Sequence, residues 1–422
     1  MRSKALWIGL ILIIFSPELY GQLSLTLDDC QNQAQVNYPL IKKRDLVERS
    51  KAYAIEKAAK GYLPQFIINA QATYQSAVTE IPIQMQGIEI PQLTKDQYKF
   101  YGELNQTIYD GGNIKQKIEL HRSTSAIEEQ SLSVALYQLK DRINQLFFSI
   151  LMIEEQLNQN QLLMKDIQLG LDKVEAAVTN GTALEADLNV LKAELLKAAQ
   201  HAVDLKANRT AYLEVLGLFL NKTLDASTKL IKPELPILPK TIQRPELALY
   251  DDQLTNIAVQ EELINVRNRP RLDFFFQGGY GRPALNILKP RFDAYYIGGL
   301  RLSWNLGGLY TQKKEKAILE INRLAIGVEK ETFLFNTHSQ AKRESVTIRR
   351  YQDLLQSDNE IIALREKVKK TAVTQLEHGV ITTNDYLREV NAEDQARLNK
   401  IIHEIQLLAS QYDYLYITGD TY

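Results

Sequence analysis

The sequence passes through one series of elements twice, and this repeat constrains the fold more than any other feature. The glycine pairs Gly111-Gly112 and Gly307-Gly308 correspond to each other, and after 69 and 71 residues the chain reaches a second matching pair, Gly181 and Gly379. Self-similarity over such a distance indicates one structural unit built twice. Each half is therefore predicted to contain a helix, two strands, a very long helix, a turn and a returning helix.

Two stretches predict helices of unusual length. Asn113 to Val178 contains no proline and only one glycine, Gly170. The corresponding stretch, Leu309 to Leu376, also contains no proline and only one glycine, Gly327. At 1.5 Å per residue, about 66 residues make a rod of roughly 100 Å. We predict long helices at 113–178 and 309–376, tip turns at 179–183 and 377–382, and returning helices at 184–216 and 383–417.

Apolar residues in these helices recur at alternating steps of four and three. Leu139, Ile143 and Leu146 begin the pattern in the first long helix, and Leu184 and Leu188 begin it in the returning helix. This spacing is typical of the a/d seam of an antiparallel coiled coil. A filament or scaffold coiled coil would explain the helices, but it would explain neither the strands nor the repeat.

Four further segments alternate apolar and polar residues and are predicted as strands. They lie at about 65–76, 97–109, 271–281 and 292–305. A soluble sandwich would show the same alternation. Lengths of about 10 to 13 residues, tyrosine and tryptophan near the strand ends, and the small number of strands favour a membrane instead.

Four strands are too few to close a barrel, for which about eight are the practical minimum. An open sheet would leave its edges unpaired in lipid. The barrel must therefore be shared between chains, and the sequence alone permits a dimer with eight strands or a trimer with twelve. The loops 81–96 and 283–291 would be the outward-facing hairpin tips.

The N-terminus predicts export. Basic residues precede the apolar run Ala5 to Phe15, and the small residue Gly21 lies where cleavage is expected, so residues 1–21 are interpreted as a signal peptide. A membrane anchor is the alternative, but about 11 apolar residues fall short of the ~20 that a spanning helix needs. The net charge of −1 does not indicate nucleic acid binding, and the single cysteine, Cys30, excludes an intrachain disulfide.

Residues 217–245 separate the two halves and contain four prolines, a density that cannot continue a helix. An irregular linker is predicted here, between a first repeat at 22–216 and a second at 246–422. The two glycine pairs are interpreted as swivels at which a strand turns into a helix. No histidine spacing suits a metal and no catalytic set converges, so we predict no enzymatic activity, no cofactor and no metal.

Several segments resemble, in order, those of the TolC-like outer-membrane factor (outer membrane efflux protein) family. The segments Leu25–Asp29, Leu63–Gln65, Ile108–Gly112 and Gly379–Leu387 look like its opening helix, strand entry, swivel and helix tip. The resemblance covers essentially the whole mature chain. It implies an α+β membrane protein in which a homotrimer shares a 12-stranded transmembrane β-barrel, continuous with a 12-helix periplasmic α-barrel and belted by the linker.

The resemblance also implies a function. The protein would lie in the cell outer membrane, in contact with outer-membrane lipid, with a long periplasmic extension. It would be the passive exit duct of a tripartite efflux pump or a type I secretion system. A periplasmic membrane-fusion adaptor and an inner-membrane pump of the RND or ABC type would be its partners.

The tip turns are the first candidate site. Glycine at the end of a helix adopts positive φ at little cost, so these residues could be simple turns. The resemblance implies that the tips also dock the helical hairpin of the adaptor, and both interpretations can hold. The residues concerned are Gly181, Thr182, Ala183, Gly379, Val380 and Ile381.

Charged residues beside the tips are the second candidate site. Asp187 and Asp385 come early in the returning helices, where a carboxylate interacts favourably with the helix dipole. The resemblance implies that Asp385 belongs to an acidic ring at the periplasmic entrance. Arg388 departs from the family pattern and would cancel part of the negative field. Asp385, Arg388 and Glu389 are also candidates for the links that hold a gate closed.

The main alternative is a periplasmic coiled-coil adaptor or a scaffold of an export complex. Adaptors carry one helical hairpin flanked by soluble β-domains, whereas this sequence carries a duplicated strand pair.

Overall fold

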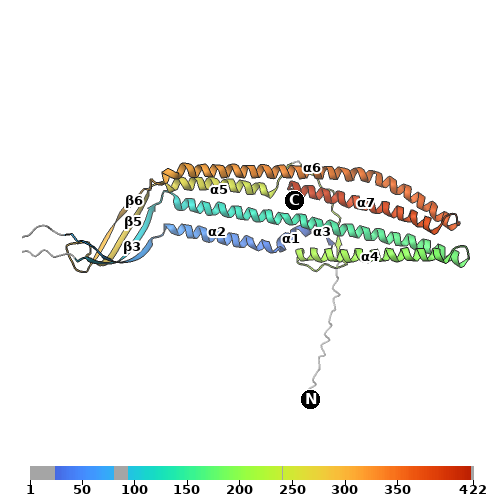
Figure 1. The fold of residues 1–422 in the computed structure, drawn as a ribbon, viewed down its shortest axis with the longest axis horizontal. Helices are drawn as coiled ribbons and strands as arrows, with labels where there is room; N and C mark the ends of the chain where they lie inside the picture. The colour runs from blue at the N-terminus through green and yellow to red at the C-terminus, as the bar shows by residue number, and fades with distance from the viewer. Residues whose placement is uncertain (1–23, 80–93, 240, 420–422) are drawn as a thin grey trace, which may run out of the picture. The chain divides into compact units, whose positions relative to one another are not determined.

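The computed structural model describes residues 24–79, 94–239 and 241–419 (Figure 1). The predicted signal peptide and most of the predicted loop 81–96 lie outside the described residues. The chain folds into two compact units, each assembled from both halves of the sequence. We call them the sheet unit (Pro39–Gln138, Pro239–Lys342 and Ile417–Tyr422) and the hairpin unit (Met1–Tyr38, Leu139–Leu238 and Arg343–Tyr416).

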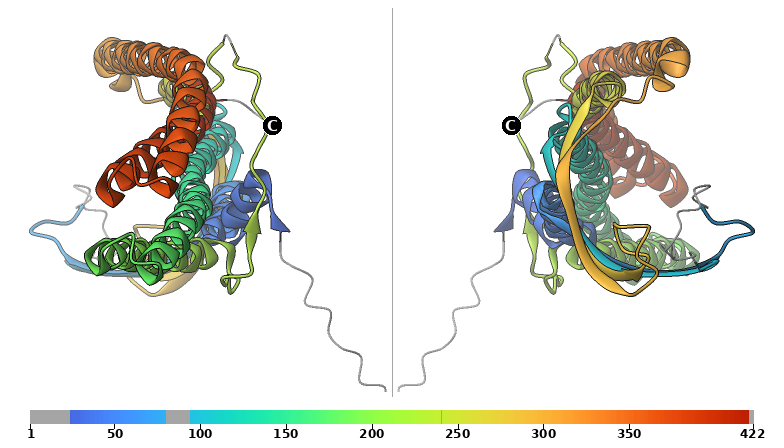
Figure 2. Two further views of the ribbon diagram at one scale, coloured as in Figure 1. Left: turned by 90° about the vertical axis from the view of Figure 1, so that its right-hand side faces the viewer. Right: turned by 90° about the vertical axis from the view of Figure 1, so that its left-hand side faces the viewer.

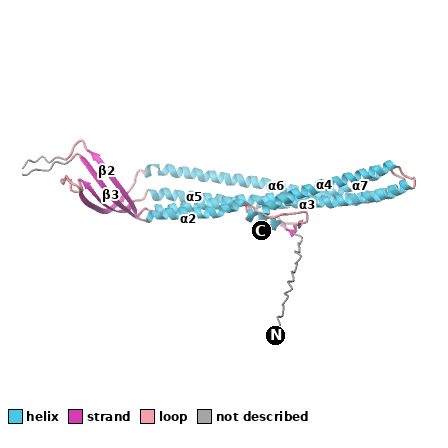
Figure 3. Ribbon diagram, turned by 90° about the horizontal axis from the view of Figure 1, so that it is seen from below, coloured by secondary structure: helices cyan, strands magenta, loops and turns pink. Residues whose placement is uncertain are grey.

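The sheet unit combines four antiparallel strands with helices that run on from them (Figure 3). The strands follow the order β2-β3-β5-β6. Their bounds are Gln65–Tyr74 (β2), Asp96–Tyr109 (β3), Arg271–Arg282 (β5) and Asp293–Ser303 (β6). The helices are α2 (Lys43–Ala59), α5 (Pro245–Arg267) and the first parts of α3 (Asn113–Thr179) and α6 (Gly308–Glu377). The pairing of β3 with β5 joins the two halves of the sequence in one curved sheet (Figure 2).

The strand register places most of the apolar side chains on one face. Phe66 lies opposite Leu104, Leu104 opposite Phe276, and Phe276 opposite Gly298. Since successive side chains point to opposite faces, the residues two positions along share this face. It carries Phe66, Ile68, Tyr74, Phe100, Leu104, Phe274, Phe276, Tyr280, Tyr296, Leu300 and Leu302. The other face carries the polar side chains of Gln65, Asn69, Gln71, Lys99, Glu103, Asn105, Arg271, Asp273, Gln277 and Arg301, together with Ile67, Tyr101, Phe275, Tyr295 and Ile297.

The two strand-to-helix joints differ although their sequences correspond. Gly111 and Gly112 have φ of 72° and 93°, and the Asp110 carboxylate accepts hydrogen bonds from the N–H groups of Gly112 and Ile114 at 2.8 and 2.5 Å. At the second joint, no positive φ occurs. Gly308 instead begins α6, where a Cβ would lie 2.1 Å from Asn268 Oδ1. The first pair thus serves a left-handed turn, whereas Gly308 allows a close approach.

The hairpin unit contains two helical hairpins and a short covering segment. One hairpin is the second part of α3 with α4 (Glu185–Leu220), and the other is the second part of α6 with α7 (Thr383–Thr418). The covering segment contains α1 (Leu27–Asn37), a small parallel sheet of β1 (Ser24–Leu25) with β4 (Lys229–Leu230), and the part of the linker that runs from the end of α4 to Leu238. Leu27, Cys30 and Ala34 of α1 are buried against apolar residues of α3, α4 and α7.

Three details differ from the expectation. Helix α4 continues to Leu220 because the buried seam continues through Leu216 and Leu220, and Asn221 ends it with φ of 52°. The linker is not wholly irregular, since β4 lies within it. The opening helix of the first half is broken into α1 and α2 by a 3-10 turn that begins at Pro39.

The predicted coiled-coil seam is also wrong at Leu184. Leu184 is 71% exposed because it is the N-cap residue of α4 and precedes the helical register. Within the described residues, no helix has a stretch that is both long and apolar enough to cross a membrane.

Candidate functional site

The two helix tips share one backbone design. At the first, Thr182 N–H donates to Ala177 O at 2.8 Å and Gly181 N–H to Val178 O at 3.0 Å. At the second, the N–H groups of residues 380 and 379 donate to the carbonyls of residues 375 and 376 at 2.8 and 3.1 Å. This pair of bonds is the Schellman motif. It requires the positive φ of Gly181 (74°) and Gly379 (64°).

The helices that follow the tips are capped differently. Thr382 Oγ1 accepts from Asp385 N–H at 3.2 Å, and the Asp385 carboxylate accepts from Thr382 N–H at 3.2 Å and from its hydroxyl at 2.7 Å. This is a complete capping box. The Thr382 hydroxyl, followed by its N–H group, lowers the pKa of Asp385. At the first tip, Leu184 has no side-chain acceptor, and only its N–H reaches Asp187, at 3.4 Å.

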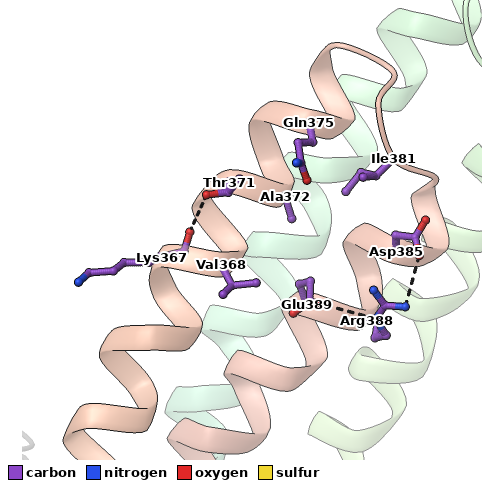
Figure 4. A pocket seen from close by; sticks show the side chains of 9 residues that line it. All are labelled: Lys367, Val368, Thr371, Ala372, Gln375, Ile381, Asp385, Arg388 and Glu389. Atoms are coloured by element: carbon purple, nitrogen blue, oxygen red, sulfur yellow. Dashed lines mark hydrogen bonds and ion pairs between the residues drawn. The ribbon is translucent and has the colours of Figure 1, made fainter.

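A cavity of about 540 Å³ lies beside the second tip, between α6 and α7 (Figure 4). Asp385, Arg388 and Glu389 of α7 line it together with Ile381 of the turn. From α6, the cavity is lined by Lys367, Val368, Thr371, Ala372 and Gln375. The hairpin therefore brings together all three predicted gate residues of the second half.

Arg388 connects the charged residues of this cavity. Its guanidinium lies 3.4 Å from Asp385 Oδ1 and 3.2 Å from Glu389 Oε1. The Arg388 side chain is 70% exposed, and exposed ion pairs of this kind contribute about 0–1 kcal/mol. Glu389 Oε2 also lies 3.4 Å from Arg365 on α6, so this carboxylate links the two helices of the hairpin.

A shared apolar core fastens the two hairpins together near their tips. Ile167, Leu191 and Val390 are fully buried in it. Tyr386 of α7 is 2% exposed, and its hydroxyl donates to Asp166 O on α3 at 2.9 Å. Burial is the main cause that raises the pKa of Tyr386 to about 12. Its ring occupies the space that Gly170 leaves, because a Cβ there would lie 2.5 Å from Tyr386 Cε1.

A half-buried ion network joins three helices just behind this core. Lys369 Nζ of α6 lies 2.9 Å from Asp166 Oδ2 of α3 and 2.8 Å from Glu393 Oε2 of α7. Glu393 is 2% exposed and also binds Arg397. Burial alone would lower the pKa of Lys369 and raise that of Glu393. Hydrogen bonds outweigh burial at both groups: Glu393 and Asp166 raise the pKa of Lys369, and Lys369 and Arg397 lower the pKa of Glu393.

The predicted docking residues fall into two groups. Gly181, Thr182, Gly379 and Val380 are exposed. Ala183 and Ile381 are partly buried and pack against the shared core. A partner that reaches the tips would therefore meet the first four residues, while the last two hold the turns against the helices.

The predicted sites are thus only partly brought together. Asp187 lies on the first hairpin and does not line the cavity. The swivel glycines lie in the sheet unit. Sequence reasoning missed Lys369, Glu393 and Tyr386, although Gly170, as the only glycine in its helix, was a signal for a close contact. In the described part of the chain, no group of three or more His, Cys, Asp or Glu residues could hold a metal ion.

Solved structures of outer-membrane channels share this fold. CusC, which forms a transmembrane channel, matches with a TM-score of 0.70 and 14% identity, over 94% of this chain and 92% of that one. The Campylobacter jejuni CmeC channel matches with a TM-score of 0.65 and 15% identity, over 93% and 85%. The open Neisseria gonorrhoeae MtrE channel matches with a TM-score of 0.66 and 12% identity, over 93% of this chain and 89% of that one. No protein-family model and no curated protein matches the sequence. The chain thus has the fold of the TolC-like outer-membrane channels.

Proposed function

We propose that this chain is the protomer of a passive outer-membrane exit duct, serving a tripartite efflux pump or a type I secretion system. The observation that carries the proposal is the two-faced sheet. One face is mainly apolar along all four strands, and the other carries most of the charged and amide side chains, with a few apolar and aromatic ones among them. Such a sheet suits a wall between lipid and a water-filled lumen.

The dimensions of the sheet fit a bilayer. The longer strands have 12 and 14 residues; at about 3.4 Å per residue, a 12-residue strand is roughly 40 Å long, and a tilt of about 45° reduces its height to roughly 30 Å. Aromatic side chains are exposed at both ends of the apolar face, as in interfacial girdles. Tyr74 and Tyr280 lie at one end, and Tyr109 and Trp304 at the other.

The sheet is incomplete as it stands. Among the described residues, β2 and β6 have no strand on their outer sides. An unpaired edge is not tolerated in lipid, so we propose that β6 of one copy pairs with β2 of the next. Twelve strands from three copies would close the barrel, with Glu103 and Arg301 of the polar face facing the lumen.

An exposed apolar stripe on the first part of α6 supports association of copies. Ile318, Ile321, Leu324 and Val328 recur at steps of three and four, and each is more than half exposed. Helices of a soluble monomer rarely expose such a seam. In a homotrimer it would pack against a helix of the neighbouring copy and continue the periplasmic α-barrel.

The tips would form the periplasmic entrance. We propose that Gly181, Thr182, Gly379 and Val380 contact the hairpin of a membrane-fusion adaptor, with Ala183 and Ile381 behind them. An inner-membrane pump of the RND or ABC type would supply the energy. Asp187 and Asp385 would contribute negative charge at the entrance, and the pairs of Arg388 with Asp385 and Glu389 would be among the links that open with the gate.

Single-channel conductance of the detergent-purified protein in a planar bilayer, with the mass of the complex measured in parallel, tests the proposal. A small, stable conductance from a trimer is expected. Asp385→Ala should lower the preference for cations, and Arg388→Ala should raise it. A water-soluble monomer without conductance would overturn the proposal and favour the adaptor or scaffold.

A further inference from the structure

A second cavity lies in the hairpin unit, away from the tips. It has a volume of about 520 Å³ and lies between α3, α4 and α7. We call it the wall groove. Its lining includes Gln145, Ser149 and Met152 of α3, Tyr212 of α4, and Ile405 and Asp413 of α7. Sites for small organic molecules have volumes of about 300–1,000 Å³ and mostly apolar walls with a few polar groups, so the wall groove has the size and composition of such a site.

The covering segment contacts these helices mainly away from the opening of the wall groove. It reaches one lining residue, because Gln31 of α1 donates to Asn144 Oδ1 at 2.6 Å. Phe147 of α3 lies in the same apolar core as the buried residues of α1. Glu154 of α3 forms an ion pair with Arg209 of α4, and Arg209 also donates to Thr228 O of the linker at 2.7 Å. At about 100° per residue, Ser149 and Met152 lie roughly 160° around the helix from Phe147 and Glu154 respectively. The left view of Figure 2 shows α1 and the linker on one side of α3, α4 and α7.

The linker would belt the outside of the periplasmic helices, so the wall groove would open toward the lumen, in the path of the cargo. The inference therefore rests on the proposed function and specifies what the wall can hold.

The charges around the wall groove select the ligand. Asp413 is the carboxylate within the lining, and Glu344 of α6 and Asp141 of α3 act on it electrostatically. Burial, then these two carboxylates, raise the pKa of Asp413 to about 7. A cation beside Asp413 would relieve this repulsion, and Met152, Ile405 and Phe148 would cover an apolar body.

We propose that the wall groove binds amphiphilic organic cations, with the charged centre beside Asp413 and the apolar body between α3 and α7. It is a transient site on the wall of the duct, which concentrates this class of cargo in the lumen. Each protomer would carry one such groove.

Equilibrium dialysis of the full-length protein in nanodiscs tests this, with tetraphenylphosphonium as the probe and tetraphenylborate, an anion of nearly the same shape, as its control. Saturable binding of the cation but not of the anion is expected. Asp413→Asn should weaken binding at least about tenfold, which corresponds to about 1.4 kcal/mol. Ser149→Trp should abolish binding by filling the groove. The matched control, Asp353→Asn, removes an exposed carboxylate of α6 and should change nothing.

Three results would overturn the inference: no saturable binding of the cation, equal binding of the anion, or binding that neither Asp413→Asn nor Ser149→Trp reduces. The mass of the complex and its helical circular dichroism show whether each variant has folded. Conductance from the same preparation separates the two proposals. A conducting protein that fails to bind the cation refutes only the groove, whereas a folded protein without conductance refutes the duct.

Discussion

Gly170→Ala is the substitution whose effect can be worked out most completely from the structure. Gly170 lies within α3, and alanine there would favour the helix by about 1 kcal/mol. The new Cβ, however, would lie 2.5 Å from Cε1 of the Tyr386 ring and 3.1 Å from its Cζ and hydroxyl oxygen. The ring is buried, so it can move only by disturbing the shared core of the two hairpins.

Two costs oppose the gain in helix propensity. Forcing a methyl group into a packed core costs about 1–3 kcal/mol. Moving the ring also breaks the hydrogen bond from Tyr386 to Asp166 O, which costs about 1 kcal/mol. Against a gain of about 1 kcal/mol from helix propensity, Gly170→Ala should therefore lower the free energy of unfolding by about 1–3 kcal/mol.

The second long helix offers a matched control. Gly327 lies within α6, and a Cβ there would have no atom of the protomer within 4 Å. Gly327→Ala should therefore stabilise the protein by about 1 kcal/mol. Thermal unfolding of both variants, followed by circular dichroism in one detergent, should move the midpoint in opposite directions. If both substitutions raise the midpoint equally, the contact between Gly170 and Tyr386 is not as described.

A double substitution tests whether the Tyr386 ring causes the loss of stability in Gly170→Ala. Replacing Tyr386 by leucine should cost stability in the wild-type protein, but it removes the ring that the alanine methyl would strike. Gly170→Ala combined with Tyr386→Leu should therefore destabilise less than the sum of the two single effects. Additive effects would mean that the two positions do not interact.

Three further outcomes are expected. Lys369→Met should lower the free energy of unfolding by about 2–4 kcal/mol, and Arg388→Met by less than about 1 kcal/mol, as measured by thermal unfolding. The lysine substitution leaves the buried Glu393 without one of its two cations, whereas Arg388 is exposed. Asp413→Asn should stabilise the protein by up to about 4 kcal/mol at pH 8 and by little at pH 4, in thermal unfolding at the two pH values. Because the pKa of Asp413 is raised to about 7, the wild-type side chain lowers stability progressively as pH rises from about 4 to about 7, and the full cost remains above pH 7. Cys30 should resist a maleimide reagent at pH 7.5 until the protein is denatured, because it is fully buried and burial raises its pKa to about 12.

The helices and strands could be anticipated because their signals are local. The proline-free stretch from Asn113 predicts one helix, and α3 ends one residue beyond the predicted end at Val178. The alternation of Phe66, Ile68 and Ala70 places three apolar side chains on one face of β2 whatever its partner. Helix ends that depend on a single contact were harder to predict. The end of α4 depends on Gly217, where a Cβ would lie 2.5 Å from Lys222 O, and glycine alone did not distinguish this approach from a helix stop.

Contacts between distant segments could not be predicted in this way. Pairing of Leu104 with Phe276 joins the two halves and decides that all four apolar rows lie on one face, but neither strand encodes which partner it meets. The same holds for Lys369, whose two partners come from α3 and α7. As a surface-type residue in a long helix, Lys369 looks in the sequence like any solvated lysine.

The differences between the two halves carry more information about the site than the repeat does. The repeat accounts for the shared turns at Gly181 and Gly379. Seven residues after these glycines, however, the first half has Leu188 whereas the second half has Tyr386. This larger side chain packs against a glycine of the other half, Gly170. At the positions of Arg388 and Glu389, the first half has the apolar Val190 and Leu191. Two charged residues of the cavity thus have apolar counterparts at the first tip, so substitutions at the second tip should affect selectivity while the corresponding ones at the first tip affect stability.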